Sequence, residues 1–128
     1  MILADSSVVI AYARGKDAKL TRLIPLHPAA VCGIVQAELL CGARDAAHRR
    51  KMLNLLAAFP QISMPESVWE IVGDSLAALR RQGVIVPFPD VAVASLGILN
   101  GLEVWARDSH FARMQTVLPP LKLFQEPP

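Results

Sequence analysis

Short apolar stretches alternate with helical patterns along this chain, and this alternation limits the folds that it can adopt. Buried strands of a parallel sheet are short continuous apolar runs, whereas helices need longer segments bounded by caps, glycine or proline. Strands are predicted over residues 1–4, 30–32, 61–63, 102–106 and 121–124. Helices are predicted over 8–13, 17–24, 34–43, 45–59, 65–82 and 91–100, and around Phe111. We therefore expect an α/β fold built around a mainly parallel sheet.

The chain has 128 residues and shows no repeat or linker, so a single domain over 1–128 is expected. No apolar run reaches the roughly 18 residues that a membrane span needs. The N-terminus lacks a basic leader and carries Asp5 inside its apolar run, which predicts no signal peptide and a cytoplasmic location. Apolar residues make up 53% of the chain, and this surplus indicates a protein partner or a homodimer.

The stretch from Pro87 to Phe111 places two carboxylates at the ends of predicted elements. Asp90 precedes an apolar run, so it is expected to be the N-cap of a helix that ends at Asn100–Gly101. Asp108 follows the strand predicted over 102–106. Ligands of open parallel sheets bind beyond the carboxyl ends of the strands, and Asp5 also falls at such an end.

Seven of the eleven acidic residues have an ordinary structural role in this pattern, as caps, on a polar helix face, in a strand or in the tail: Asp17, Asp45, Glu66, Glu70, Asp74, Glu103 and Glu126. Four others lie inside or beside apolar runs: Asp5, Glu38, Asp90 and Asp108. Each of the four taken alone could be a cap or a partly exposed helix residue. Isolated buried carboxylates are costly unless they are paired or bind a metal. The four together therefore favour a shared site.

Converging carboxylates repel one another unless cations neutralise them. Their hard oxygen atoms suit Mg²⁺ or Mn²⁺, and an all-carboxylate metal site suits phosphodiester hydrolysis. The only two cysteines, Cys32 and Cys41, lack the spacing of a metal-binding pair. A zinc site is therefore not expected, and both cysteines are predicted to be buried reduced thiols.

Four segments, over residues 3–11, 36–42, 89–95 and 106–111, contain these four acids in order. With them the chain resembles the PIN-domain ribonucleases, most closely the VapC-type toxins of bacterial toxin–antitoxin pairs. The resemblance implies a three-layer α/β/α PIN-like domain and an Mg²⁺-dependent endoribonuclease, with Mn²⁺ as the other candidate ion. It assigns both the catalytic and the metal-binding roles to Asp5, Glu38, Asp90 and Asp108. It also implies an RNA substrate, a small antitoxin that silences the enzyme, and a homodimer.

Other residues join the expected site less directly. The family uses a hydroxyl after the first Asp, which would be Ser6 or Ser7, and Ser7 is the candidate for substrate binding. Arg107 could hold a phosphate or be an ordinary surface residue. His110 could touch metal or phosphate, although a packing or solvent-facing role is favoured because no second His lies near it. The chain departs from the family pattern at three positions where a hydroxyl is common: Cys32, Val35 and Ala106.

Three interpretations of the function follow. The leading one is a metal-dependent endoribonuclease whose arginine clusters hold the RNA backbone. The missing hydroxyls motivate a second one, a PIN-like module that binds RNA or protein without cutting, although retention of all four acids argues against it. The third is a phosphorylated receiver domain. Such a domain needs an Asp at the end of a mid-chain strand, and this chain has none after the strand predicted at 61–63.

The two tryptophans are assigned structural positions. Trp105 is expected in the core, and Trp69 in the core or at a dimer contact.

Overall fold

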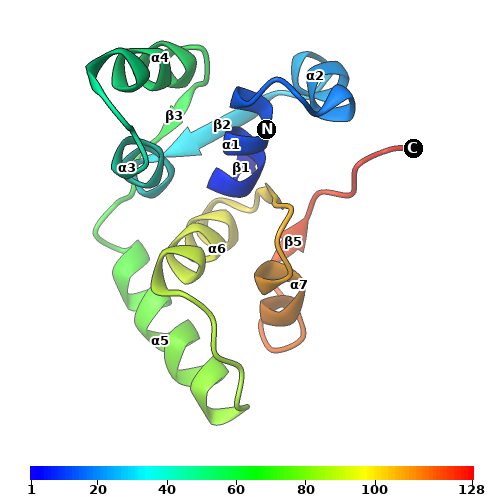
Figure 1. Ribbon diagram of the computed structural model, residues 1–128. Helices are drawn as coiled ribbons and strands as arrows, with labels where there is room; N and C mark the ends of the chain where they lie inside the picture. Colours follow the sequence, from blue (N-terminus) through cyan, green and yellow to red (C-terminus); the bar gives the residue numbers. More distant parts are fainter.

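The fold is organised around five parallel strands that occupy the places expected from the apolar runs (Figure 1). The computed structural model describes all residues from Met1 to Pro128. The strands are β1 (Ile2–Ala4), β2 (Ala29–Cys32), β3 (Gln61–Ile62), β4 (Glu103–Trp105) and β5 (Lys122–Leu123). Their order in the sheet is β3-β2-β1-β4-β5, and every pairing is parallel. The predicted α/β class is thus confirmed, with a sheet that is wholly rather than mainly parallel.

Seven helices flank this sheet: α1 (Ser6–Ala13), α2 (Ala18–Leu23), α3 (Gly33–Cys41), α4 (Ala46–Ala57), α5 (Val68–Arg81), α6 (Phe88–Asn100) and α7 (His110–Gln115). A single 3₁₀ turn, Ile24–Leu26, follows α2. In Figure 1, α3 and α4 lie towards the β2–β3 side, α5 extends beside α6, and α7 lies next to β5. None of the helices combines the length and the apolar character that crossing a bilayer requires.

The starts of two helices differ from the expected ones. Helix α1 begins at Ser6 rather than at residue 8, and Asp5 is its N-cap, with a side chain that accepts a hydrogen bond from the backbone N–H of Ser7. Helix α6 begins at Phe88, so Asp90 lies in its first turn and is not the cap. Pro89 is tolerated there because the first helical N–H groups need no partner within the helix. The predicted end of α6 is confirmed, since Gly101 adopts the left-handed conformation with φ of 65°.

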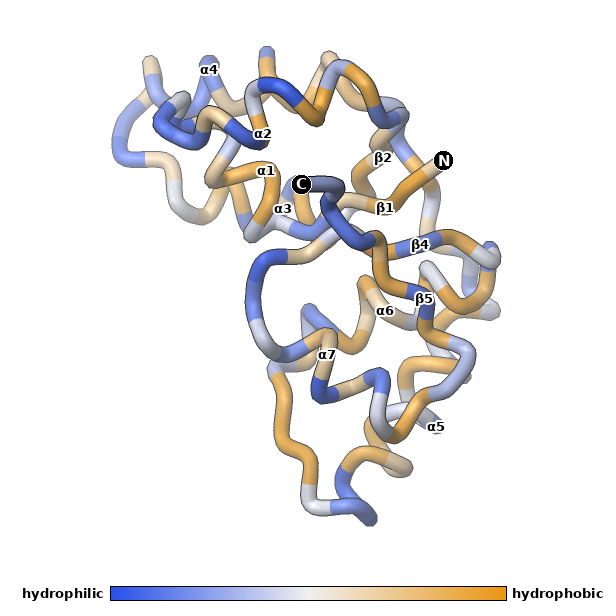
Figure 2. Tube along the Cα trace, turned by 90° about the vertical axis from the view of Figure 1, so that its right-hand side faces the viewer, coloured by the Kyte–Doolittle hydropathy of each residue, from blue (hydrophilic) through white to orange (hydrophobic).

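Helix α6 is the most deeply buried element, with every residue from Asp90 to Gly97 buried. Hydrophobic residues run through β1 and α6 at the centre of the molecule (Figure 2). Trp105 is completely buried, as expected, and its ring lies 4.6 Å from that of Phe124. Trp69 is 39% exposed, so it is not a core residue. Cys32 is buried, but the expectation of a buried thiol is wrong for Cys41, which is the last residue of α3 and is exposed.

Gly97 allows α6 to approach β4 closely. A Cβ atom at this position would lie 2.7 Å from Cγ2 of Val104, well inside contact distance. Because Val104 is itself fully buried, we expect Gly97→Ala to lower the free energy of unfolding by about 1–3 kcal/mol. Urea denaturation followed by circular dichroism measures this change.

Gly73 in α5 is the matched control, since a Cβ atom there would meet nothing within 4 Å. Alanine has the higher helix propensity, so Gly73→Ala should raise stability by about 0.5–1 kcal/mol. A Gly97→Ala variant as stable as the wild type would contradict the tight packing of α6 on β4.

Candidate metal centre

The strand order brings two of the four acids to the same edge of the sheet. After β3 the chain returns to the other side of β1, so the direction of strand addition reverses between β1 and β4. Ligands of open α/β sheets bind at such a switch point. Asp5 directly follows β1, and Asp108 lies three residues after the end of β4. Asp90 reaches the region from the first turn of α6, and Glu38 from α3.

Two of these side chains, those of Asp90 and Asp108, form a tight group with His110. The ligand atoms of Asp90, Asp108 and His110 all lie within 4.8 Å of one another. The Nδ1 atom of His110 is 2.6 Å from Oδ2 of Asp90 and 3.7 Å from Oδ1 of Asp108. The backbone N–H of His110 also donates to Oδ1 of Asp108, at 2.9 Å, because Asp108 turns back over the start of α7. The local sequence favours a packing role for His110, whereas the structure places it between two acids.

Asp5 and Glu38 each present a buried oxygen atom without a hydrogen-bond partner. Asp5 is 1% exposed, and its Oδ2 accepts from the N–H and the hydroxyl of Ser7 at 3.1 and 2.7 Å. Its Oδ1 has no partner, and neither does Oε1 of Glu38. Orphaned buried oxygen atoms are rare in native proteins and call for an explanation. Carboxylate oxygens beside an imidazole nitrogen form a donor set that fits a divalent cation such as Mg²⁺ or Mn²⁺.

The acids influence one another electrostatically. Burial, followed by the negative charges of Asp5 and Asp108, raises the pKa of Asp90 to about 6, although the contact with His110 opposes this shift. Burial also raises the pKa of Asp5 and, helped by the charges of Asp5 and Asp108, that of Glu38. Burial and neighbouring negative charge therefore disfavour the ionised forms of Asp5, Glu38 and Asp90, and a bound cation would relieve this repulsion.

Ser7 connects the two strand ends that carry acids. Its hydroxyl donates to Oδ2 of Asp5 and accepts from the backbone N–H of Arg107, at 3.0 Å. The loop before Asp108 is thereby attached to the start of α1. Ser6, the other candidate hydroxyl, lies near Glu38 and partly offsets the rise in the pKa of that residue. Burial raises the pKa of the Cys32 thiol, which favours its neutral form beside these acids.

Arg107 makes its ion pairs with residues outside the acid group, which comprises Asp5, Glu38, Asp90 and Asp108. Its Nε and Nη2 atoms donate to the two carboxylate oxygens of Glu126, at 2.7 and 2.9 Å, and its Nη1 pairs with Asp17. Glu126 also accepts from the indole N–H of Trp105 at 3.0 Å. The guanidinium therefore joins the segment before α2 to the C-terminal tail. No local sequence signal could reveal this network, because Glu126 and Asp17 lie 19 and 90 residues from Arg107.

Comparisons with known proteins agree with this geometry. The model of the PIN domain family matches residues 2–117. Ribonuclease VapC10 of Mycobacterium tuberculosis is 31% identical over 128 residues, covering 94% of this chain and 92% of that protein. Among solved structures, VapBC2 from Rickettsia felis, bound to a promoter DNA fragment, has a TM-score of 0.85 at 18% identity, covering 97% of this chain and 98% of its own. A toxin–antitoxin complex from Klebsiella pneumoniae has a TM-score of 0.70 at 19% identity, covering 96% and 100%. At these identities, the two structures support the fold alone.

Proposed function

This chain belongs to the PIN-domain family and groups with the VapC ribonucleases, and we propose that it is a metal-dependent endoribonuclease acting as the toxin of a toxin–antitoxin pair. The convergence of Asp90, Asp108 and His110, with the unpartnered oxygens of Asp5 and Glu38 on the same acidic edge, carries this proposal. A surface used only for binding gains nothing from buried carboxylates that raise each other's pKa.

In this proposal the four acids Asp5, Glu38, Asp90 and Asp108 hold Mg²⁺, or Mn²⁺ with the same ligands. The bound ion supplies Lewis acidity, which lowers the pKa of water and stabilises negative charge on phosphate oxygens. Asp90 and Asp108 present the carboxylate oxygens of the tight group. Glu38 completes the ligand set or orients the attacking water through Oε1.

Two neighbouring residues are assigned positioning roles. His110 holds the carboxylate of Asp90 through Nδ1. Ser7 donates a hydrogen bond to Oδ2 of Asp5, which leaves Oδ1 of Asp5 without a partner and free to bind the ion. Contacts of this kind orient metal ligands and tune their basicity. Arg107 is not assigned a phosphate, because Glu126 and Asp17 occupy its guanidinium.

We also propose that the chain is one domain, that it acts in the cytoplasm, and that it forms a homodimer silenced by an antitoxin. The Klebsiella pneumoniae structure, which has the same fold, is a toxin–antitoxin complex, and this motivates the proposal of an antitoxin partner. Exposed apolar side chains support protein contacts, above all Ile85 at 82% and Leu26 at 67% exposure.

The purified chain should cleave single-stranded RNA when Mg²⁺ or Mn²⁺ is added. Chelation by EDTA should stop cleavage, and an excess of the ion should restore it, because the carboxylates alone cannot activate water at neutral pH. Gel analysis of end-labelled RNA measures both effects. If the chain binds RNA but cuts it with neither ion, the proposed function is wrong and a PIN-like binding module remains. Cleavage that persists in EDTA would equally contradict the metal centre.

A further inference from the structure

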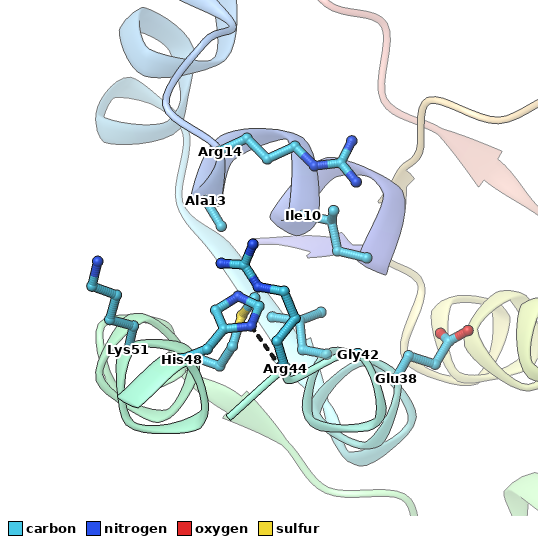
Figure 3. A pocket seen from close by; sticks show the side chains of 10 residues that line it. Ile10, Ala13, Arg14, Glu38, Gly42, Arg44, His48 and Lys51 are labelled. Atoms are coloured by element: carbon cyan, nitrogen blue, oxygen red, sulfur yellow. Dashed lines mark hydrogen bonds between the residues drawn. The ribbon is translucent and has the colours of Figure 1, made fainter. Parts of the chain in front are cut away.

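A basic cavity begins at Glu38 and runs between α1, α3 and α4 (Figure 3). Its volume is about 450 Å³. Its basic lining comes from Arg14, the C-cap of α1, from Arg44 in the loop between α3 and α4, and from Lys51 on α4. Leu39 and Met52 contribute apolar lining. In Figure 3 the carboxylate of Glu38 points away from these bases and towards α6, drawn in yellow-green, which carries Asp90. Glu38 thus belongs both to this basic cavity and to the acid group.

The three bases of the cavity have no acidic partner. The ion pairs between basic and acidic side chains involve only Lys19, Arg107 and His110. Arg14, Arg44 and Lys51 are exposed and form none of them. Three unpaired cations beside one cavity create a positive potential that attracts a polyanion.

His48 adds a neutral donor to the same cavity. Its Nδ1 accepts from the backbone N–H of Arg44 at 3.0 Å, and its own backbone N–H donates to Asp45 at 2.7 Å. With Nδ1 accepting, the neutral ring carries its proton on Nε2 and can donate it. The first turn of α4 therefore holds Arg44 and His48 together in one fixed arrangement.

We infer that this basic cavity binds the sugar–phosphate backbone of the RNA on one side of the bond to be cut. The inference rests on the proposed ribonuclease function and specifies where its substrate lies. Arg14, Arg44 and Lys51 contact successive phosphates, and the apolar lining offers contact to sugars and bases. Because Glu38 borders the cavity, a strand that follows the three bases leads directly to the acid group. This continuity favours RNA over an acidic protein segment, which would need only the charges.

The test compares RNA binding by two variants that lose the same charge. In the first, Arg14→Gln, Arg44→Gln and Lys51→Gln empty the cavity of its bases. In the second, Arg49→Gln, Arg50→Gln and Arg80→Gln remove three exposed bases that do not line it, two of them on α4. Fluorescence anisotropy of a short labelled single-stranded RNA in EDTA gives the Kd over a range of salt concentrations without cleavage. Circular dichroism checks that both variants fold.

We expect the cavity variant to bind RNA at least about 10-fold more weakly and to lose roughly 0.7 of the log–log salt slope for each phosphate contact. The control variant should keep nearly the wild-type Kd and slope. Equal losses in the two variants, or no loss in the cavity variant, would overturn the inference. If the true occupant of the cavity is an acidic protein, the cavity variant should show no loss of RNA binding. If the wild-type chain cuts RNA while the cavity variant binds it normally, only this inference fails. If the wild type cuts nothing but binding depends on the cavity, the site stands and the ribonuclease function fails.

Discussion

Replacing Asp90 with Asn is expected to lower the rate of RNA cleavage by roughly 10²–10³-fold. Asn keeps the shape of the side chain but removes the negative charge from the tight group with Asp108 and His110. A site built from carboxylates loses several kcal/mol of transition-state stabilisation when one charge is lost, and about 1.4 kcal/mol corresponds to a tenfold change in rate. Initial rates on a labelled RNA with saturating Mg²⁺ measure the effect.

Asp74→Asn serves as the control for this substitution, since Asp74 is exposed on α5 and has no partner in an ion pair. It should cleave RNA at the wild-type rate. Expression in bacteria gives an independent readout, in which the wild type and Asp74→Asn arrest growth and Asp90→Asn does not. Equal toxicity, or equal cleavage, of Asp90→Asn and the wild type would remove Asp90 from the catalytic machinery.

The metal-free chain should lose stability as the pH rises from about 4 to above 6. Asp90 titrates at about 6 in the folded chain, against its ordinary value of 3.8. Between these values the folded state holds a proton that the unfolded state has released, so the free energy of unfolding falls with increasing pH, by about 3 kcal/mol in total. Other groups titrate in this range, and the quantity to follow is therefore the stability difference between the wild type and Asp90→Asn. This difference should shift in favour of Asp90→Asn as the pH rises.

Adding Mg²⁺ or Mn²⁺ at pH 7 should restore the lost stability, because an ion that binds only the folded chain stabilises it by about 2.7 kcal/mol at 100 times its Kd. Asp90→Asn should gain much less. Urea denaturation at several pH values, with and without the ion, measures both effects. A stability difference that stays constant with pH would show that Asp90 does not titrate in the folded chain as its burial and neighbours require.

The location of the helix and strands around Asp90 could be predicted from sequence, because an apolar run, a terminal glycine and a short strand are local signals. The exact start of α6 could not. Pro87 and Pro89 are two residues apart, and either is compatible with a helix start, since a proline in the first turn removes no helical hydrogen bond. In the structure α6 takes the earlier start, with Pro87 as its N-cap, and Asp90 therefore lies in the first turn with its side chain beside His110.

Asp5, Glu38 and Asp90 could be singled out because each stands in an apolar run that does not tolerate a charge without a partner, and Asp108 because it follows a buried strand. The residues that hold them in place gave no such signal. The contacts between His110 and Asp90, and between Ser7 and the loop at Arg107, join segments 20 and 100 residues apart. Glu126 has an ordinary tail composition around it, and only the fold brings it to Arg107 and Trp105. Local periodicity carries no information on such pairs.

The order of the strands also sets when this enzyme can become active during its synthesis. β1 can pair with β2 early, because the two strands are close in the chain, but its other neighbour, β4, emerges from the ribosome about one hundred residues after β1. Until β4 and Asp108 have been translated, β1 and Asp5 therefore have no neighbouring strand on that side of the sheet. The acid group thus cannot assemble on a nascent chain before the segment that carries β4 and Asp108 has left the ribosome.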